Sequence, residues 1–240
     1  MNALYKLVDS WSTFTRYAII FPERVTTPYF PAASFMGIEG ISVGLRYVDL
    51  LLKAVKGNDY SAIGEYFKKI YGICKEIGQK LGIECLGIDV SPSPWLNESV
   101  CEVVESFNGI RFPGPGVSWS IHKINEIVLK EAIKKNVKVT GFNEVMLSVA
   151  EDNLLKKRVL ENNVRLRDLA VLTAYCVAGL DMVSFSIEDK LDYLLRSLYD
   201  VYAASMVKHR VLGVRLIPSN EKPWNKLHYG EFGYIPIIEV

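Results

Sequence analysis

The 240-residue sequence carries almost no net charge and has no long hydrophobic run. Lys and Arg number 28 against 27 Asp and Glu, a formal charge of +1. Proteins that attract nucleic acid or anionic membranes over long range carry a clear basic excess. No apolar stretch approaches the roughly 18 residues of a membrane helix, and the N-terminus lacks a secretory signal pattern. We therefore expect a cytoplasmic protein that binds neither nucleic acid nor membrane.

Cysteine and histidine are also scarce. The four cysteines, Cys74, Cys85, Cys101 and Cys176, include no C-x-x-C pair, and the three histidines are far apart in the sequence. This spacing predicts neither a disulfide framework nor a metal site, so we expect reduced thiols. The sequence also lacks the G-x-G-x-x-G and Lys-Ser/Thr signatures of nucleotide-binding loops, and it identifies no cofactor.

The sequence does contain short apolar runs that alternate with longer helical periods. Strands are predicted at 17–21, 83–90, 137–147, 180–186, 210–218 and 234–240, and helices at 44–56, 60–81, 94–107, 117–135, 148–161, 165–178 and 188–207. Apolar strands separated by helices indicate an α/β fold with mostly parallel strands, because parallel pairing requires crossover connections. No linker interrupts the chain, so we predict a single domain over 1–240, with a helical lead-in at 1–16.

Polar turns follow the predicted strands. Ser148 and Glu151 in "SVAE" form the pattern of a capping box, and "SIED" at 186–189 is a weaker version. Ser93 can cap a helix whose first residue is Pro94, where a missing N–H costs nothing. In α/β folds ligands bind at the carboxyl ends of the strands, so these turns are the expected place for a site.

Asp89 is the first candidate for a catalytic group. It ends an apolar strand in "GIDVSPSPWLNESV", with Ser91 and Ser93 beside it and Glu98 further along. These groups predict a carboxylate that orients or deprotonates a substrate, next to hydroxyls and helix N–H groups that hold an anion. The alternative is structural: Asp89 accepts hydrogen bonds from the following turn, and Ser93 only caps a helix.

Other candidates interrupt apolar segments further along the chain. Asn143 and Glu144 require partners or a ligand, because an unpaired buried polar side chain costs about 1–3 kcal/mol. Glu144 is the second catalytic candidate, unless one of the two residues simply faces solvent. Asp152 and Asp181 lie close to strand and helix ends and are candidate ligand-binding residues. Arg215 within "VLGVRLIP" should meet a carboxylate of the chain or an anionic ligand.

A glycine-containing turn and a lone cysteine complete the candidates. In "FPGPGVSWS", Gly116 and Ser118 stand where a helix begins, so their backbone N–H groups could receive a carboxylate or phosphate. A plain tight turn explains the same residues. Cys176 falls on the apolar side of its predicted helix, which favours a buried side chain over a nucleophile.

Four segments together, "GIDVSPSPWLNESV", "GFNEVMLSVAEDN", "TAYCVAGLDMVSFS" and "VLGVRLIPSNEKPW", resemble the PFL-like family called domain of unknown function 711. The resemblance covers roughly 17–240 and implies helices around a barrel of the glycyl-radical-enzyme type. The chain looks like a C-terminal half of such proteins. It therefore predicts a half-barrel that pairs with another copy or with a separate N-terminal half.

The resemblance does not extend to radical chemistry. A glycyl radical enzyme needs an Arg-Val-x-Gly-Tyr-like loop near its C-terminus, and "GEFGYIPIIEV" lacks the Arg-Val pair. We expect an enzyme that acts on a small anionic metabolite at the carboxyl ends of the strands, without a glycyl radical. The alternative is a non-catalytic protein, either a metabolite-binding regulatory module or a structural oligomer.

Overall fold

The computed structural model describes residues 11–35, 37–188, 191–228 and 230–240. The helices are α2 (Trp11–Phe14), α3 (Val48–Gly57), α4 (Ser61–Leu81), α5 (Val100–Asn108), α6 (Val117–Lys134), α7 (Asn153–Leu160), α8 (Leu166–Leu172), α9 (Leu191–Lys208) and the 3-10 turn η1 (Gly230–Phe232). The strands are β1 (Ile19–Phe21), β2 (Gly40–Gly44), β3 (Glu84–Asp89), β4 (Met146–Ser148), β5 (Ala178–Asp181), β6 (Val183–Ser186), β7 (Leu212–Val214), β8 (Leu216–Ser219), β9 (Lys226–His228) and β10 (Tyr234–Ile238).

The strands form short sheets that lie side by side. Two sheets are parallel pairs, β2 with β3 and β4 with β5, and a third is the antiparallel pair of β1 and β7. The fourth sheet has the order β8-β6-β10-β9, in which β6 is parallel to β8 and β10, and β9 is antiparallel to β10. Isolated backbone bonds join neighbouring sheets and the segments that follow them: the Met146 N–H donates to Pro92 O at 3.0 Å, the Gly213 N–H to Val177 O at 3.3 Å, and the Arg215 N–H to Leu180 O at 3.0 Å. The α/β class is confirmed. Within the described residues no sheet closes into the expected barrel.

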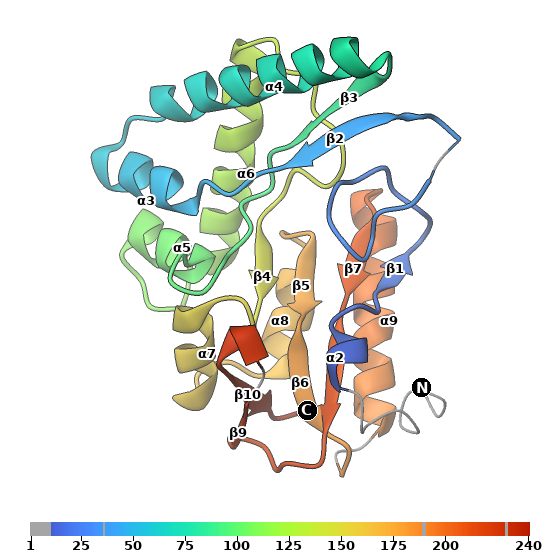
Figure 1. Cartoon of the computed structure of the whole chain (residues 1–240). Coiled ribbons are helices and arrows are strands. Elements are labelled where there is room, and N and C mark those ends of the chain that lie inside the picture. Colours follow the sequence, from blue (N-terminus) through green and yellow to red (C-terminus); the bar gives the residue numbers. More distant parts are fainter. Residues whose placement is uncertain (1–10, 36, 189–190, 229) are drawn as a thin grey trace.

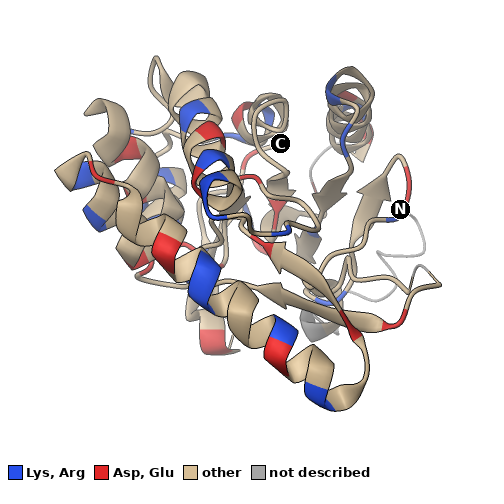
Figure 2. Cartoon of the chain, turned by 90° about the horizontal axis from the view of Figure 1, so that it is seen from above, with Lys and Arg blue, Asp and Glu red and all other residues tan. Residues whose placement is uncertain are grey.

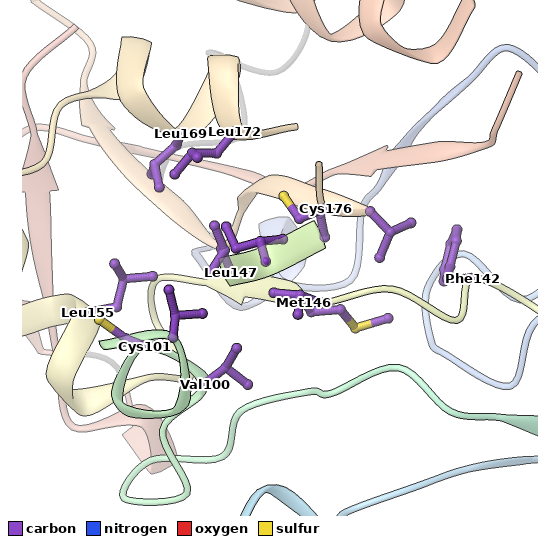
Figure 3. Packing of buried hydrophobic residues seen from close by; sticks show 14 of the residues in the cluster. Val100, Cys101, Phe142, Met146, Leu147, Leu155, Leu169, Leu172 and Cys176 are labelled. Carbon is purple, nitrogen blue, oxygen red and sulfur yellow. The ribbon is translucent and has the colours of Figure 1, made fainter. Parts of the chain in front are cut away.

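Helices cover this row of strands and share one apolar core with it. α4 runs across β2 and β3, and α9 lies beside β1 and β7 (Figure 1). In the centre, side chains from α5, α7 and α8 meet at β4 (Figure 3). The buried cluster extends along most of the described chain, from Leu45 to Ile238. The apolar runs of the sequence therefore supply the core that the α/β pattern requires.

The long helix predicted at 60–81 is confirmed as α4. Its apolar face buries Ile63, Phe67 and Cys74 at helical spacing. Gly82 follows with φ +69, and its N–H bonds to the carbonyls of the last turn. A residue without Cβ adopts this left-handed conformation at little cost, which is why the helix ends there.

The helix predicted at 94–107 begins later than expected. α5 starts at Val100, and its N-cap is Ser99, whose Oγ accepts the Glu102 N–H at 2.9 Å. Ser93 is therefore not the cap. Trp95 and Glu98 instead exchange two backbone hydrogen bonds of 3.0 Å, which satisfies the backbone of this segment without a helix.

The strand predicted at 137–147 and the capping box after it are also wrong in extent. Only Met146–Ser148 forms a regular strand, and Asn143, with φ +57, turns the preceding loop. The following helix begins at Asn153 and not at 149, because Asp152 caps it in place of Ser148.

Several shorter elements differ from the sequence-based expectation. The helix predicted at 165–178 ends at Leu172, and 178–181 pairs as β5. The predicted strands at 180–186 and 210–218 are each interrupted, at Met182 (φ +51) and at Arg215. β2 and β9 were not predicted. In the weak "SIED" box Ser186 accepts the Glu188 N–H at 3.3 Å, while residue 189 lies outside the described residues.

The expectation of reduced thiols is wrong for one pair. Cys74 in α4 and Cys85 in β3 form a disulfide, with their Cα atoms 5.8 Å apart. The turn at Gly82 folds the strand back along the helix and brings together two cysteines that no short motif connects. Cys101 and Cys176 are buried free thiols.

The surface of the described residues carries both signs of charge. Basic and acidic residues are interspersed along the helices seen from above, including α4 (Figure 2). Among the described helices, none combines the length and the apolar character needed to cross a membrane.

Asp152 joins the start of two helices. Its carboxylate accepts the N–H groups of Leu154 and Leu155 in α7, each at 3.0 Å. It also accepts the Cys101 N–H of α5 at 2.9 Å and the Ser99 hydroxyl at 2.6 Å. The side chain is fully buried, so these donors replace its hydration.

We predict that Asp152→Ala lowers the free energy of unfolding by about 2–4 kcal/mol, because a cap is lost and buried donors are left unpaired. Urea denaturation monitored by circular dichroism measures this. The control is Asp59→Ala, since exposed Asp59 accepts one N–H, from Ser61, at the start of α4. If Asp152→Ala lowered the free energy of unfolding no more than the control does, Asp152 would not stabilise the starts of both α5 and α7.

Candidate functional site

A cavity of about 400 Å³ lies where the carboxyl ends of several strands meet. Gly44, Asp181 and Val214 are the last residues of β2, β5 and β7, and all three line it. Ser93 and Glu151, which follow β3 and β4, line it as well. We call this cavity the strand-end pocket. It lies at the edge of the strands where the sequence places a ligand.

A charged cluster of Glu151, Asp181 and Arg215 forms part of its wall. Arg215 Nε donates to Asp181 Oδ1 at 2.5 Å and Nη2 donates to Asp181 Oδ2 at 2.7 Å, a bidentate pair. Nη2 also lies 3.2 Å from Glu151 Oε1. Met182 separates β5 from β6, and Arg215 separates β7 from β8. Because β6 pairs with β8 from Val183 and Leu216 onward, these two breaks lie next to each other and bring Asp181 beside Arg215.

The surroundings of Glu151 shift the pKa of its carboxyl upward. Burial raises the pKa of Glu151, and the neighbouring Asp181 raises it further, while Arg215 opposes both effects. Burial lowers the pKa of Arg215, but Asp181 and Glu151 outweigh it, so the guanidinium keeps its charge. Glu151 therefore holds its proton to higher pH than an exposed glutamate.

A second guanidinium, that of Arg46, also reaches the strand-end pocket. Arg46 Nη2 donates to Glu98 Oε1 at 2.5 Å, and its guanidinium carbon lies 5.5 Å from the ring centre of Trp95. The side chain is 57% exposed, so solvent and ligands can reach it. Arg46 escaped sequence reasoning because it follows β2, a strand that was not predicted. The one available signal was its place two residues after the glycine-framed run "GISVG".

Tyr29 is another wall residue that sequence reasoning missed. Its hydroxyl lies 3.3 Å from the Ser91 carbonyl oxygen and 3.4 Å from that of Leu45. Burial raises its pKa, and Asp89 raises it further, so Tyr29 stays protonated. Its one hydroxyl proton is directed at these carbonyl oxygens of the chain.

Asp89 does not line the strand-end pocket. Its carboxylate is fully buried and accepts five hydrogen bonds from the chain. Oδ1 receives the Ser91 N–H at 3.1 Å, the Ser91 hydroxyl at 2.6 Å and the Asn143 N–H at 3.0 Å. Oδ2 receives the Phe142 N–H at 2.8 Å and the Thr27 hydroxyl at 3.1 Å. Together the five hydrogen bonds thus join segments of the chain to one another.

Gly141 allows this arrangement. It adopts φ +83, and a Cβ there would lie 2.2 Å from Asp89 Oδ2. Only a glycine lets the loop approach closely enough for the next two N–H groups to reach the carboxylate.

The other candidate residues fall into three groups. Ser93, Asp181 and Arg215 line the strand-end pocket. Ser91, Asn143 and Asp152 belong to buried networks, and Asn143 Oδ1 accepts the Val90 N–H at 3.1 Å. Glu144 and Glu98 form ion pairs, with Lys208 at 2.7 Å and with Arg46.

Gly116 and Ser118 lie elsewhere, in a broader hollow of about 870 Å³ at the start of α6. Arg165 and Arg167 line that hollow too. The sequence placed these residues and Ser93 in a single site, and the structure separates them.

Among the described residues no three His, Cys, Asp or Glu side chains converge as a metal site. Burial raises the pKa of the Cys176 thiol to about 12, and its neighbour Lys208 only partly offsets this. A thiol with such a pKa is a poor nucleophile at neutral pH.

We predict that Asp89→Asn lowers the free energy of unfolding by about 2–4 kcal/mol, because an amide NH₂ would face donors in place of an accepting oxygen. Chemical denaturation checks this, with Asp49→Asn on the exposed side of α3 as control. An unchanged stability would mean that the five hydrogen bonds to Asp89 do not stabilise the fold.

The chain matches known proteins over most of its length. The family described as Uncharacterised ACR (DUF711) matches residues 9–225. Among its relatives, the UPF0210 protein of Bifidobacterium longum subsp. infantis is 29% identical over 230 residues, covering 88% of this chain and 51% of the relative. The UPF0210 protein of Lactobacillus helveticus is 26% identical over 241 residues, covering 92% and 54%.

A third relative, the UPF0210 protein of Sulfurisphaera tokodaii, is 26% identical over 158 residues, which cover 65% of this chain and 36% of the relative. The chain spans about half the length of the curated relatives that match most of it. The family match extends across the four segments that suggested the resemblance, from the β3 turn to β8. The chain belongs to the Uncharacterised ACR (DUF711) family.

Proposed function

We propose that the chain binds a small anionic metabolite in the strand-end pocket and that Glu151 exchanges a proton with it. The observation that carries the proposal is the combination of two guanidiniums, Arg46 and Arg215, with the buried carboxyl of Glu151, whose pKa is raised by burial, in one cavity. A cavity of about 400 Å³ falls within the range of about 300–1,000 Å³ in which proteins bind small molecules.

The charge balance supports an anion. Arg215 and Asp181 neutralise each other through their bidentate pair, and Arg46 is similarly paired with Glu98. With Glu151 protonated, an arriving anion meets two guanidiniums and no unpaired carboxylate. With Glu151 ionised, the same anion meets one excess negative charge. Binding therefore favours protonated Glu151, which could serve as a general acid.

Asp89 and Glu144, the catalytic candidates from sequence, would act through position in this proposal. Asp89 holds the loop that carries Phe142, a wall residue. Glu144 holds Lys208 at the end of α9, beside the same loop. The chemistry assigned to the pocket requires no radical, in keeping with the missing Arg-Val loop. A metabolite-binding regulatory module would use the same pocket without turnover, and a structural oligomer would not need it.

We further propose that the row of parallel strands is a half-barrel completed by another copy or by a separate N-terminal half. The support is that β1 and β2 are unpaired on one side within the described residues, and that relatives are about twice as long. Exposed Tyr199, Met206 and Val207 on α9 offer an apolar surface nearby.

We predict that binding of a screened anion weakens as pH rises through the raised pKa of Glu151, by up to about tenfold per pH unit, the limit for one linked proton. The probes are monocarboxylates, dicarboxylates and phosphate esters, first in a thermal-shift screen and then by calorimetry at several pH values. In Glu151→Gln the pH dependence should disappear, because the amide mimics the protonated acid.

The control variant is Glu126→Gln, an exposed residue of α6 paired with Lys123. It should keep the wild-type pH profile. Equal profiles for wild type and Glu151→Gln would remove Glu151 from the site, and a screen without any bound anion would refute the proposed function. A product assay on each bound compound separates an enzyme from a binding module.

The half-barrel predicts self-association or capture of a second chain. Sedimentation velocity at micromolar concentration should show a dimer or larger species, and Val207→Asp should weaken it if α9 takes part. A stable monomer that also fails to bind a co-expressed N-terminal half of a relative would contradict this proposal.

A further inference from the structure

The strand-end pocket has far more carbon than polar groups in its wall. Apart from the charged residues, most of its lining is apolar and comes from several separate segments, including Ile20, Phe30, Pro31, Phe142, Met146 and Val214. An apolar ligand removes such a surface from water, which is favourable. A hydrated anion in the same place leaves the apolar wall in contact with water and gains nothing from it.

The polar groups of the wall are largely occupied by the chain itself. Arg215 uses Nε and Nη2 for Asp181 and Glu151, and Nη1 lies 3.5 Å from the Thr15 carbonyl oxygen. Glu151 also interacts with the Ser148 side chain, and Ser93 with the Tyr29 hydroxyl. What remains for a ligand is chiefly the exposed guanidinium of Arg46, which bonds to Glu98 through Nη2. This guanidinium suffices for one anionic group.

Phe30 adds an independent observation. It lines the pocket but remains 67% exposed, so its ring presents apolar surface to whatever enters. An apolar ligand would cover that ring and remove it from water. A phosphate or a short dicarboxylate would leave it exposed.

We infer that the ligand is a monoanion with a sizeable apolar body, an aromatic or aliphatic carboxylate. This inference rests on the proposed function, because it assigns the anionic end to Arg46 and the charged cluster. The apolar body then occupies the volume between Phe30 and Phe142, and its size determines affinity.

The test is a series of ligands of equal charge and increasing apolar size: acetate, butyrate, hexanoate and phenylacetate, measured by calorimetry on the full chain. Affinity should rise about fourfold for each added methylene that is buried. Hexanamide should bind at least tenfold more weakly than hexanoate, because it lacks the charge.

Two variants make the test specific. Phe30→Ala should flatten the increase along the series, and its exposure makes a folding defect unexpected. Phe35→Ala, also exposed at 72% but outside the lining, is the matched control and should behave as wild type.

The outcomes separate this inference from the proposed function. If succinate or phosphate binds and affinity stays flat along the series, the ligand class is wrong and the anion site stands. If hexanamide binds as tightly as hexanoate, the anion site is wrong. If no member of the series and neither polar anion binds, both are refuted.

Discussion

Five hydrogen bonds converge on the buried carboxylate of Asp89, and the geometry of the strand-end pocket depends on them. They connect the end of β3 to the loop around Phe142 and to the loop that carries Thr27 and Tyr29. A buried carboxylate without donors would be too costly to keep, so the surrounding backbone must adopt the conformation that supplies them. The absence of a Cβ at Gly141 makes that conformation possible.

Asp89 and Asp152 are both buried carboxylates whose lost hydration is replaced by hydrogen bonds from the chain. Each is fully buried, and each accepts backbone N–H groups from segments about fifty residues apart in the chain. The charged cluster of Glu151, Asp181 and Arg215 differs, because its carboxylates share one guanidinium and face a cavity. A carboxyl in that position can exchange its proton with a ligand, whereas the carboxylates of Asp89 and Asp152 are buried and accept hydrogen bonds from the chain itself.

Local sequence patterns predicted an element correctly where nearby residues determine its conformation. α4 follows from its apolar spacing and from Gly82, and the strands at β1 and β3 follow from their apolar runs. Patterns failed where distant residues provide the partners. The segment before α5 looks helical, but its backbone bonds to itself and to Glu151; Leu96 N–H donates to the Glu151 carbonyl. Of the site, Ser93, Asp181 and Arg215 were predictable, whereas Arg46 and Tyr29 were not.

The sequence by itself determined the α/β class, the main helices and the presence of charged residues at strand ends, because these depend on periodicity and on the cost of burying charge. Only the tertiary structure decided which of those charges meet. Desolvation and hydrogen bonding act between residues far apart in the chain, and small changes in backbone direction at Gly141, Met182 and Arg215 determine the outcome. For that reason Asp89, the most suggestive residue of the sequence, supports the pocket from behind, and Glu151, read as a helix cap, faces into it.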